Sequence, residues 1–277
     1  MPYPSYPKTS YDYFPYSGIH RPVVLYSLPL TCIEDLKIST DIQGSDGMVS
    51  VQVRLSQPDT AHGSLHLNGF DTRLSTELHF LNGLAEAVFT VPNAKFWSDQ
   101  MPYLYELTVS TESDLYHLPV GIRTIAVQDG HILLNGKSVK LNGFGRHEDF
   151  FISGKGLNLP LLVKDYQLMK CAGANSYRTS HYPYSEEEMQ LADREGFLVI
   201  NEIPAVGLQF GGDASTDRLL QQCKGQLEAL ISRDKNHPSV VMWSVANEPL
   251  VNSQPSSVVE ARESTEEVGS RLIQELI

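Results

Sequence analysis

Ionisable and amide side chains follow directly after four apolar runs in the second half of the chain. The four groups are Arg146-His147-Glu148-Asp149, Arg178-Thr179-Ser180-His181, Asn201-Glu202 and Asn247-Glu248. If the apolar runs are parallel strands, their carboxyl ends face one rim, and these groups would meet there. Carboxylates and a guanidinium held close together are costly unless they pair or do chemistry. The combination indicates a site on this rim, although each group alone would fit an ordinary polar loop.

A metal site is the rival interpretation of His147, Glu148, His181 and Glu202. Zinc sites usually show paired ligands at short spacing, such as two histidines four residues apart on one helix. No HExxH or comparable spacing occurs here, and the three cysteines stand far apart in the sequence. We therefore expect neither a metal nor a cofactor.

Strand and helix patterns alternate after residue 125, in the order that would place these groups at strand ends. A proline near its start, apolar residues at helical spacing and Gly173 as its C-cap predict a helix over 158–171. Ser185 followed by Glu188 has the capping-box pattern, and Gly196 closes that second helix. Four βα units in succession predict a parallel barrel or an open sheet. The predicted strands are 139–145, 174–179, 197–201 and 240–246, with further helices at 216–234 and 257–277.

Residues 21–125 show the alternation that is typical of antiparallel strands. Val49, Val51, Val53 and Leu55 are apolar, and polar residues stand between them. Similar runs occur at 64–67, 84–91 and 103–109, separated by Gly, Asp, Asn and Pro. This pattern predicts a β-sandwich of about a hundred residues. Because its strands carry no pattern for chemistry, we expect a packing or spacing module.

The overall composition excludes several classes of partner. A net charge of −12 and a pI near 5.1 disfavour nucleic acid and anionic membranes, which are bound by excess Lys and Arg. The first twenty residues lack the apolar core of a secretory signal, and no stretch is long enough to span a bilayer. Three cysteines give no disulfide framework. We therefore expect a reducing compartment, the cytoplasm.

Three long runs carry a family resemblance. They read NGFGRHEDFFISGKG over 142–156, GANSYRTSHYPYSEE over 173–187 and RDKNHPSVVMWSVANEP over 233–249. Together they resemble glycoside hydrolase family 2, and within it the β-glucuronidase group, whereas NEP alone would identify only the wider clan of barrel glycosidases. Upstream, YFPYSGIHRPVVLY over 13–26 is similar to the end of the family's N-terminal sugar-binding jelly-roll domain. The resemblance covers essentially the whole chain.

The resemblance implies a multidomain fold of β and α/β parts. Residues 1–20 would be a remnant of the jelly-roll domain, and 21–125 an immunoglobulin-like β-sandwich. Residues 126–277 would form the N-terminal half of a (β/α)8 TIM barrel, which is the catalytic domain in this family. The chain ends inside a helical pattern without a stop signal, so we expect a protein truncated after its fourth barrel strand.

Site residues carry over from the family motifs one by one. Glu248 corresponds to the general acid/base, and Asn247 to the amide that holds the sugar 2-hydroxyl. Arg178 matches the arginine that orients the nucleophilic carboxylate. His147 and Asp12 match polar residues that contact the sugar in the β-glucuronidase group.

The implied function is retaining hydrolysis of β-D-glucuronides, with a glucuronide or related carbohydrate as the partner. Retention requires an acid/base and a nucleophilic carboxylate about 5 to 5.5 Å apart. In the family, the nucleophile and the Asn-x-Lys group that recognises the uronate both lie beyond the position of Ile277. We therefore expect this polypeptide alone to be inactive and poorly stable, since half a barrel exposes two strand edges.

Several alternatives stay open. The complete protein could be a β-galactosidase or β-mannosidase relative, which share the fold and the acid/base glutamate. A different class is a non-catalytic carbohydrate-binding protein in which the sandwich supplies the function. A homo-oligomer is compatible with the complete protein. For Glu202 and His181, a structural role beside the pocket is the favoured interpretation.

Overall fold

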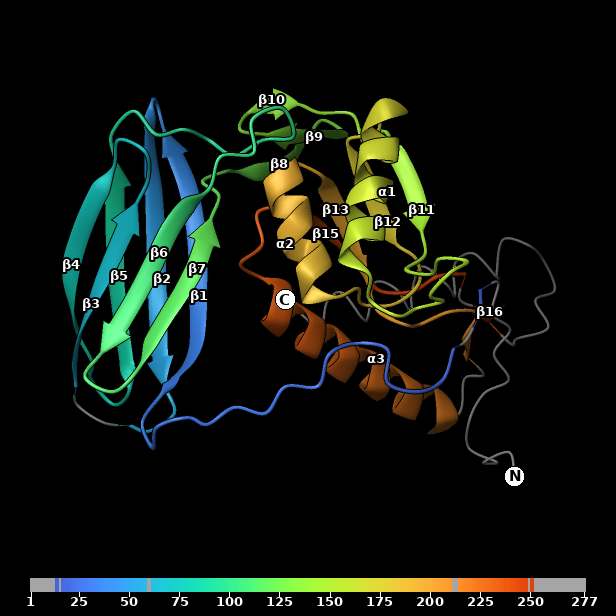
Figure 1. Cartoon of the computed structure of the whole chain (residues 1–277), viewed down its shortest axis with the longest axis horizontal. Helices are drawn as coiled ribbons and strands as arrows, with labels where there is room; N and C mark the ends of the chain where they lie inside the picture. The colour runs from blue at the N-terminus through green and yellow to red at the C-terminus, as the bar shows by residue number, and fades with distance from the viewer. Residues whose placement is uncertain (1–12, 15, 59–60, 211–213, 249, 252–277) are drawn as a thin grey trace.

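The computed structural model describes residues 13–14, 16–58, 61–210, 214–248 and 250–251. It shows a sandwich of two antiparallel sheets beside a layer of parallel strands and helices (Figure 1). This arrangement confirms the predicted fold class. The helix predicted at 257–277 and the residue Asp12 lie outside the described residues. No helix in the described ranges is long and apolar enough to cross a membrane.

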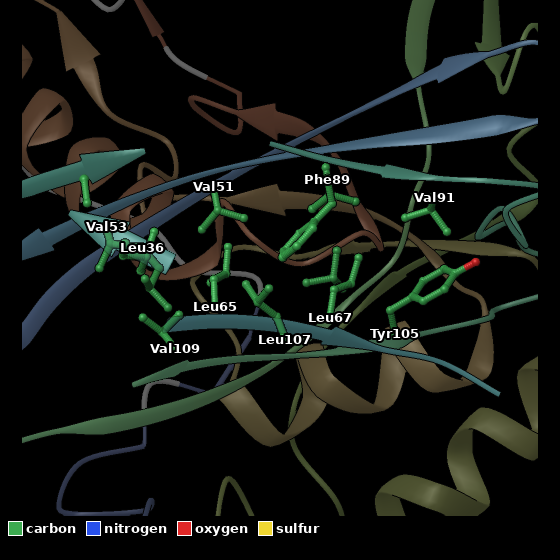
Figure 2. Packing of buried hydrophobic residues seen from close by; sticks show 14 of the residues in the cluster. Leu36, Val51, Val53, Leu65, Leu67, Phe89, Val91, Tyr105, Leu107 and Val109 are labelled. Carbon is green, nitrogen blue, oxygen red and sulfur yellow. The ribbon is translucent and has the colours of Figure 1, made fainter. Parts of the chain in front are cut away.

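The sandwich is built from strands that alternate between buried and exposed residues. Val49, Val51, Val53 and Leu55 are buried as predicted, while Ser50 and its polar neighbours face outward. Figure 2 shows Val51 of this strand, and Phe89 of the strand paired with it, facing leucines of the other sheet, namely Leu65, Leu67 and Leu107. One sheet has the order β1-β2-β5 and the other β4-β3-β6-β7. The strands are β1 (Ile33–Gln43), β2 (Asp46–Leu55), β3 (His62–Asn68), β4 (Arg73–His79), β5 (Leu84–Val91), β6 (Tyr105–Thr111) and β7 (Leu115–Val120).

A small three-stranded sheet connects the sandwich to the parallel strands, and it was not predicted. It consists of β8 (Ile125–Gln128), β9 (His131–Leu134) and β10 (Lys137–Ser138). The predicted strand at 139–145 begins too early, because β11 spans only Gly143–Arg146. Val139 and Leu141 are apolar for another reason: they pack against the cluster of Trp97, Leu134 and Leu198. The apolar run therefore marks a buried linker followed by a short strand.

Four parallel strands follow in chain order, and three helices cover one side of them (Figure 1). The strands are β11, β12 (Ser176–Thr179), β13 (Leu198–Glu202) and β15 (Val240–Ser244), with α1 (Leu159–Cys171), α2 (Glu186–Glu195) and α3 (Ala214–Asp234) between them. Gly143 in β11 lets the first two strands approach, since a Cβ there would stand 1.8 Å from the Ser176 carbonyl oxygen. Two short strands, β14 (Gln209–Phe210) and β16 (Leu250–Val251), pair in parallel after β13 and β15.

The helix ends follow the predicted caps with two differences. The helix α1 has Ala172 as its C-cap, so the predicted cap Gly173, in the left-handed conformation, lies one residue beyond the observed cap. At α2, Ser185 accepts a hydrogen bond from the Glu188 backbone N–H, and Gly196 is left-handed as predicted. The returning half of the capping box is absent, because Glu148 accepts from the Ser185 N–H and Glu188 turns inward.

Direct hydrogen bonds join the sandwich to the parallel layer. Arg123, after the last sandwich strand, donates to the carbonyl oxygens of Pro238 (3.0 Å) and Val240 (2.9 Å). Burial lowers the pKa of Arg123, and the nearby Asp193 carboxylate opposes that shift. Trp97 Nε1 donates to the Asp193 carbonyl oxygen at 2.8 Å. The strand β15 is therefore held at its start by the neighbouring domain.

Replacing Arg123 by methionine should destabilise the chain by about 2 kcal/mol, because the partly buried guanidinium makes two hydrogen bonds that methionine cannot replace. Urea unfolding followed by circular dichroism would measure the loss. The matched control is Arg54→Met, which removes only an exposed ion pair with Glu34 and should cost less than about 1 kcal/mol. Equal losses in the two variants would contradict this role for Arg123.

Candidate active site

The carboxyl ends of β12, β13 and β15 bring predicted site residues together. Arg178 lies in β12 and Glu202 ends β13, directly opposite Ser244 at the end of β15. Asn247 follows β15 and is fixed through its backbone: its N–H donates to Ala205 O at 2.8 Å, and its carbonyl accepts from Gly207 N at 2.9 Å. These backbone bonds place Asn247, and with it Glu248, beside the loop that leaves β13.

Glu202 is the centre of a buried polar network. Its side chain is fully buried, and both carboxylate oxygens have partners. His181 Nδ1 lies 2.6 Å from Oε1, and Ser244 Oγ donates to Oε2 at 2.5 Å. Arg178 Nε lies 3.2 Å from the same Oε2. Because its oxygens are already occupied, Glu202 is suited to holding neighbours in place rather than to attacking a substrate.

Arg178 connects this network to Asn247. Its Nη2 donates to Asn247 Oδ1 at 2.9 Å, while its Nε faces Glu202. A guanidinium carries only donors, so the oxygen of the Asn247 amide must face Arg178. The Nδ2 group then points to the other side. An amide held in this way can donate to a hydroxyl oxygen of a bound molecule.

Glu248 differs from Glu202 in exposure, in pairing and in backbone conformation. Its side chain is exposed, and within the described ranges it takes part in no hydrogen bond or ion pair. Its backbone is left-handed, with φ +47°. This conformation costs a non-glycine residue roughly 1–3 kcal/mol and is concentrated at functional sites. The carboxyl group of Glu248 is therefore open to solvent directly after Asn247.

An aromatic cluster surrounds His147, the residue after β11. The ring centroids of Tyr13 and His181 lie 5.3 Å and 5.8 Å from that of His147. Tyr182 contributes a hydroxyl 3.4 Å from His147 Nδ1, and Lys155 Nζ stands 3.3 Å from the centre of the Tyr182 ring. This cluster brings the segment around residue 13 to the strand ends, although these residues are far apart in sequence.

Arg146 does not reach the rim on which the sequence pattern had placed it. It is buried between β11 and the helices, in ion pairs with Glu188 and with Asp165, the latter at 2.6 Å. Burial alone would lower its pKa, but Glu188 and three surrounding tyrosines outweigh burial and raise it. Glu148 is also structural, since it pairs with Arg21 at 2.7 Å and caps α2. Of the four polar residues 146–149 that follow the first apolar run, only His147 and Asp149 therefore lie in the region around the rim.

Other members of the site were not predicted. Ser244 is the last residue of an apolar run, and only the register of β13 against β15 reveals its contact with Glu202. Tyr13 stands directly after Asp12 in the same motif, which could have indicated it. A cavity of about 430 Å³ opens beside His147 and is lined by residues of β11, of the loop after it and of α1, among them Phe144 and Asp149. Among the described residues, no group of three or more His, Cys, Asp or Glu could hold a metal ion.

Family models and curated relatives identify the same family for this chain. The family described as "Glycosyl hydrolases family 2, TIM barrel domain" matches residues 125–274, and "Glycosyl hydrolases family 2" matches 31–123. The β-glucuronidase of Felis catus is 42% identical over 260 residues, which cover 89% of this chain and 39% of that protein. The β-glucuronidase of Paenibacillus borealis is 43% identical, over 86% of this chain and 41% of that protein.

Solved structures agree with this result. A β-glucuronidase of an uncultured Clostridium species superposes with a TM-score of 0.84 and 40% identity, covering 98% of this chain and 46% of that one. The Ruminococcus gnavus β-glucuronidase in complex with C6-substituted uronic isofagomine gives a TM-score of 0.76 and 35% identity, over 87% and 41% of the two chains. The chain thus spans about two fifths of the length of the curated relatives it matches. It belongs to glycoside hydrolase family 2.

Proposed function

We propose that the protein containing this chain hydrolyses β-D-glucuronides with retention of configuration, with Glu248 as the acid/base. The observation that carries this proposal is the contrast between the two glutamates at the strand ends. Glu202 is buried and fully paired, whereas Glu248 is exposed, unpaired within the described ranges and adjacent to an oriented amide. The similarity to several proteins named β-glucuronidase supports the choice of sugar.

The proposed reaction has two steps. In the first, protonated Glu248 gives its proton to the glycosidic oxygen while a second carboxylate attacks the anomeric carbon, and the aglycone leaves as an alcohol. In the second, the Glu248 carboxylate takes a proton from water, the water oxygen attacks the anomeric carbon, and the enzyme carboxylate is released. Glu248 returns to its protonated form after one turnover, so the proton balance closes.

The other predicted residues have supporting roles in this proposal. Asn247 donates from Nδ2 to the sugar 2-hydroxyl, consistent with the orientation that Arg178 imposes on its amide. Arg178 orients the attacking carboxylate, the role that its match to the family motif implies. His147 and Asp12 contact sugar hydroxyls, supported for His147 by its place in the aromatic cluster beside the strand ends. We further propose the domain division 1–20, 21–125 and 126–277, close to the boundaries of the matched families.

An assay on three aryl glycosides tests the function. The full-length product of the gene should release the aryl alcohol from the β-D-glucuronide, and much more slowly from the matching β-galactoside and β-mannoside. Proton NMR of the first-formed sugar would show the β-anomer if configuration is retained. Preference for the galactoside or mannoside would overturn the substrate, and formation of the α-anomer would overturn the mechanism.

A polypeptide limited to residues 1–277 should not turn over the glucuronide. Double displacement requires a second carboxylate beside the acid/base. Of the three others at the described strand ends, Glu148 and Glu202 are held in ion pairs, and Asp149 lines the cavity between β11 and α1. The measurement is aryl alcohol release by this polypeptide, with its Glu248→Gln variant as the blank. Turnover by the parent polypeptide above that of the variant would show that a nucleophile is present within the 277 residues.

A further inference from the structure

We propose that Glu202 is a positioning residue for the 2-hydroxyl of the substrate, acting through Arg178 and Asn247. The inference rests on the proposed function and assigns a role to a buried carboxylate that the two reaction steps do not use. Three contacts carry it: Glu202 to Arg178, Arg178 to Asn247, and Asn247 to the strand-end backbone. Each can be followed from residue to residue without a gap longer than 3.2 Å between polar atoms.

Glu202 is the fixed end of this chain of contacts. Its carboxylate has no exposed surface, and its backbone N–H donates to Thr179 Oγ1 at 2.8 Å. Ser244 Oγ, on the next strand, donates to one carboxylate oxygen, and His181 contacts the other. Groups from three neighbouring segments thus fix the carboxylate position, so that Arg178 meets a rigid negative charge.

Arg178 links the fixed Glu202 carboxylate to the Asn247 amide. Its side chain is about one-third exposed, and a flexible arginine at a rim would adopt several rotamers without a partner. The Glu202 carboxylate attracts the guanidinium as an ion pair, with Oε2 at 3.2 Å from Nε, and in this position Nη2 donates to Asn247 Oδ1. The Asn247 amide cannot turn over, because its Nδ2 group would then face the donor Nη2. The negative charge of Glu202 therefore decides which atom of Asn247 is offered to the sugar.

Rates on substrates with and without the 2-hydroxyl distinguish this positioning role from a merely structural role of Glu202. A substrate without that hydroxyl cannot use the Asn247 donor, so the orientation of the amide no longer matters to it. A variant that only loosens the fold would slow both substrates by the same factor. The comparison of an aryl β-glucuronide with its 2-deoxy counterpart therefore isolates the positioning effect, in the manner of a double-mutant cycle.

The test uses Glu202→Gln in the full-length product of the gene. We expect kcat on the parent glucuronide to fall roughly 10- to 100-fold. This is the usual effect of losing one hydrogen bond in a charged environment, here the bond from the Asn247 amide to the substrate 2-hydroxyl. The loss on the 2-deoxy substrate should be at least ten times smaller. The control Glu195→Gln removes an exposed partner of Lys170 at the end of α2 and should change neither rate. Ser244→Ala, which removes one hydrogen bond to Glu202, should give the same selective loss at smaller size.

The outcomes separate the two proposals. Absence of glycosidase activity in the parent enzyme would overturn the proposed function. An active parent with equal losses on both substrates would overturn only the role of Glu202. If Glu202→Gln does not fold, as judged by circular dichroism, Ser244→Ala decides alone: a selective loss on the parent glucuronide supports the role, and equal losses overturn it.

Discussion

Glu248→Gln should lower kcat/KM for an alkyl β-glucuronide by about 10²–10⁴-fold, the usual contribution of general acid–base catalysis. Glutamine has the same shape as glutamate but cannot donate a proton to the leaving oxygen. An alkyl alcohol is a poor leaving group and depends on that proton, whereas a nitrophenolate leaves without it. The measurement is the ratio of variant to parent kcat/KM on both substrates, made with the full-length product. We expect the loss to be much larger for the alkyl substrate.

The second step offers an independent check of the same residue. Removal of the base also slows attack by water, but azide is an anion and needs no deprotonation. Added azide should therefore accelerate the variant and yield a glycosyl azide, while it leaves the parent unchanged. Because Glu248 is exposed, its replacement should shift the free energy of unfolding by less than about 0.5 kcal/mol. Unchanged rates on the alkyl substrate would remove Glu248 from the acid/base role.

Local sequence patterns predicted those elements whose burial is periodic. The sandwich strand around Val51 alternates strictly, and β13 is apolar on both faces, so each had a clear pattern. The caps of α2 were predicted from Ser185 and Gly196 because capping depends on neighbouring residues. The strand predicted at 139–145 began too early, since a buried linker and a strand can both be apolar. Periodicity cannot separate these cases.

The site could be predicted only in part, because its contacts join residues that are distant in the sequence. The strand ends could be placed on one rim from the order of strands alone, and this put Arg178, Glu202 and Asn247 near each other. The sequence could not show which of them pair, since that depends on strand register. Arg146 illustrates the problem: the last residue of a strand faces either the rim or the helices, and a shift of one position exchanges the two. The catalytic roles of the site residues stay predictions.

Arg146→Met should cost about 3–5 kcal/mol of stability, the second large effect we expect, because it leaves the carboxylate of Glu188 buried without its counter-ion. The guanidinium lies among the rings of Tyr166, Tyr177 and Tyr184, 5.4 to 5.7 Å from their centres. It joins β11 to both α1 and α2 through Asp165 and Glu188. Methionine fills part of this space but neutralises neither acid.

The size of that loss should depend on pH, through Glu188. Burial raises the pKa of Glu188 from 4.5 to about 7, although Arg146 opposes the shift. The folded chain therefore holds a proton that the unfolded chain has released, and this stabilises the fold fully below about pH 4.5 and fades as pH rises through about 7. Without Arg146, protonated Glu188 is tolerated and ionised Glu188 is not.

Urea unfolding should show a larger loss of stability for Arg146→Met at pH 8 than at pH 5.5. A second variant, Arg146→Met with Glu188→Gln, should recover much of the stability at pH 8. An equal loss at both pH values would show that the lost interaction is packing rather than charge.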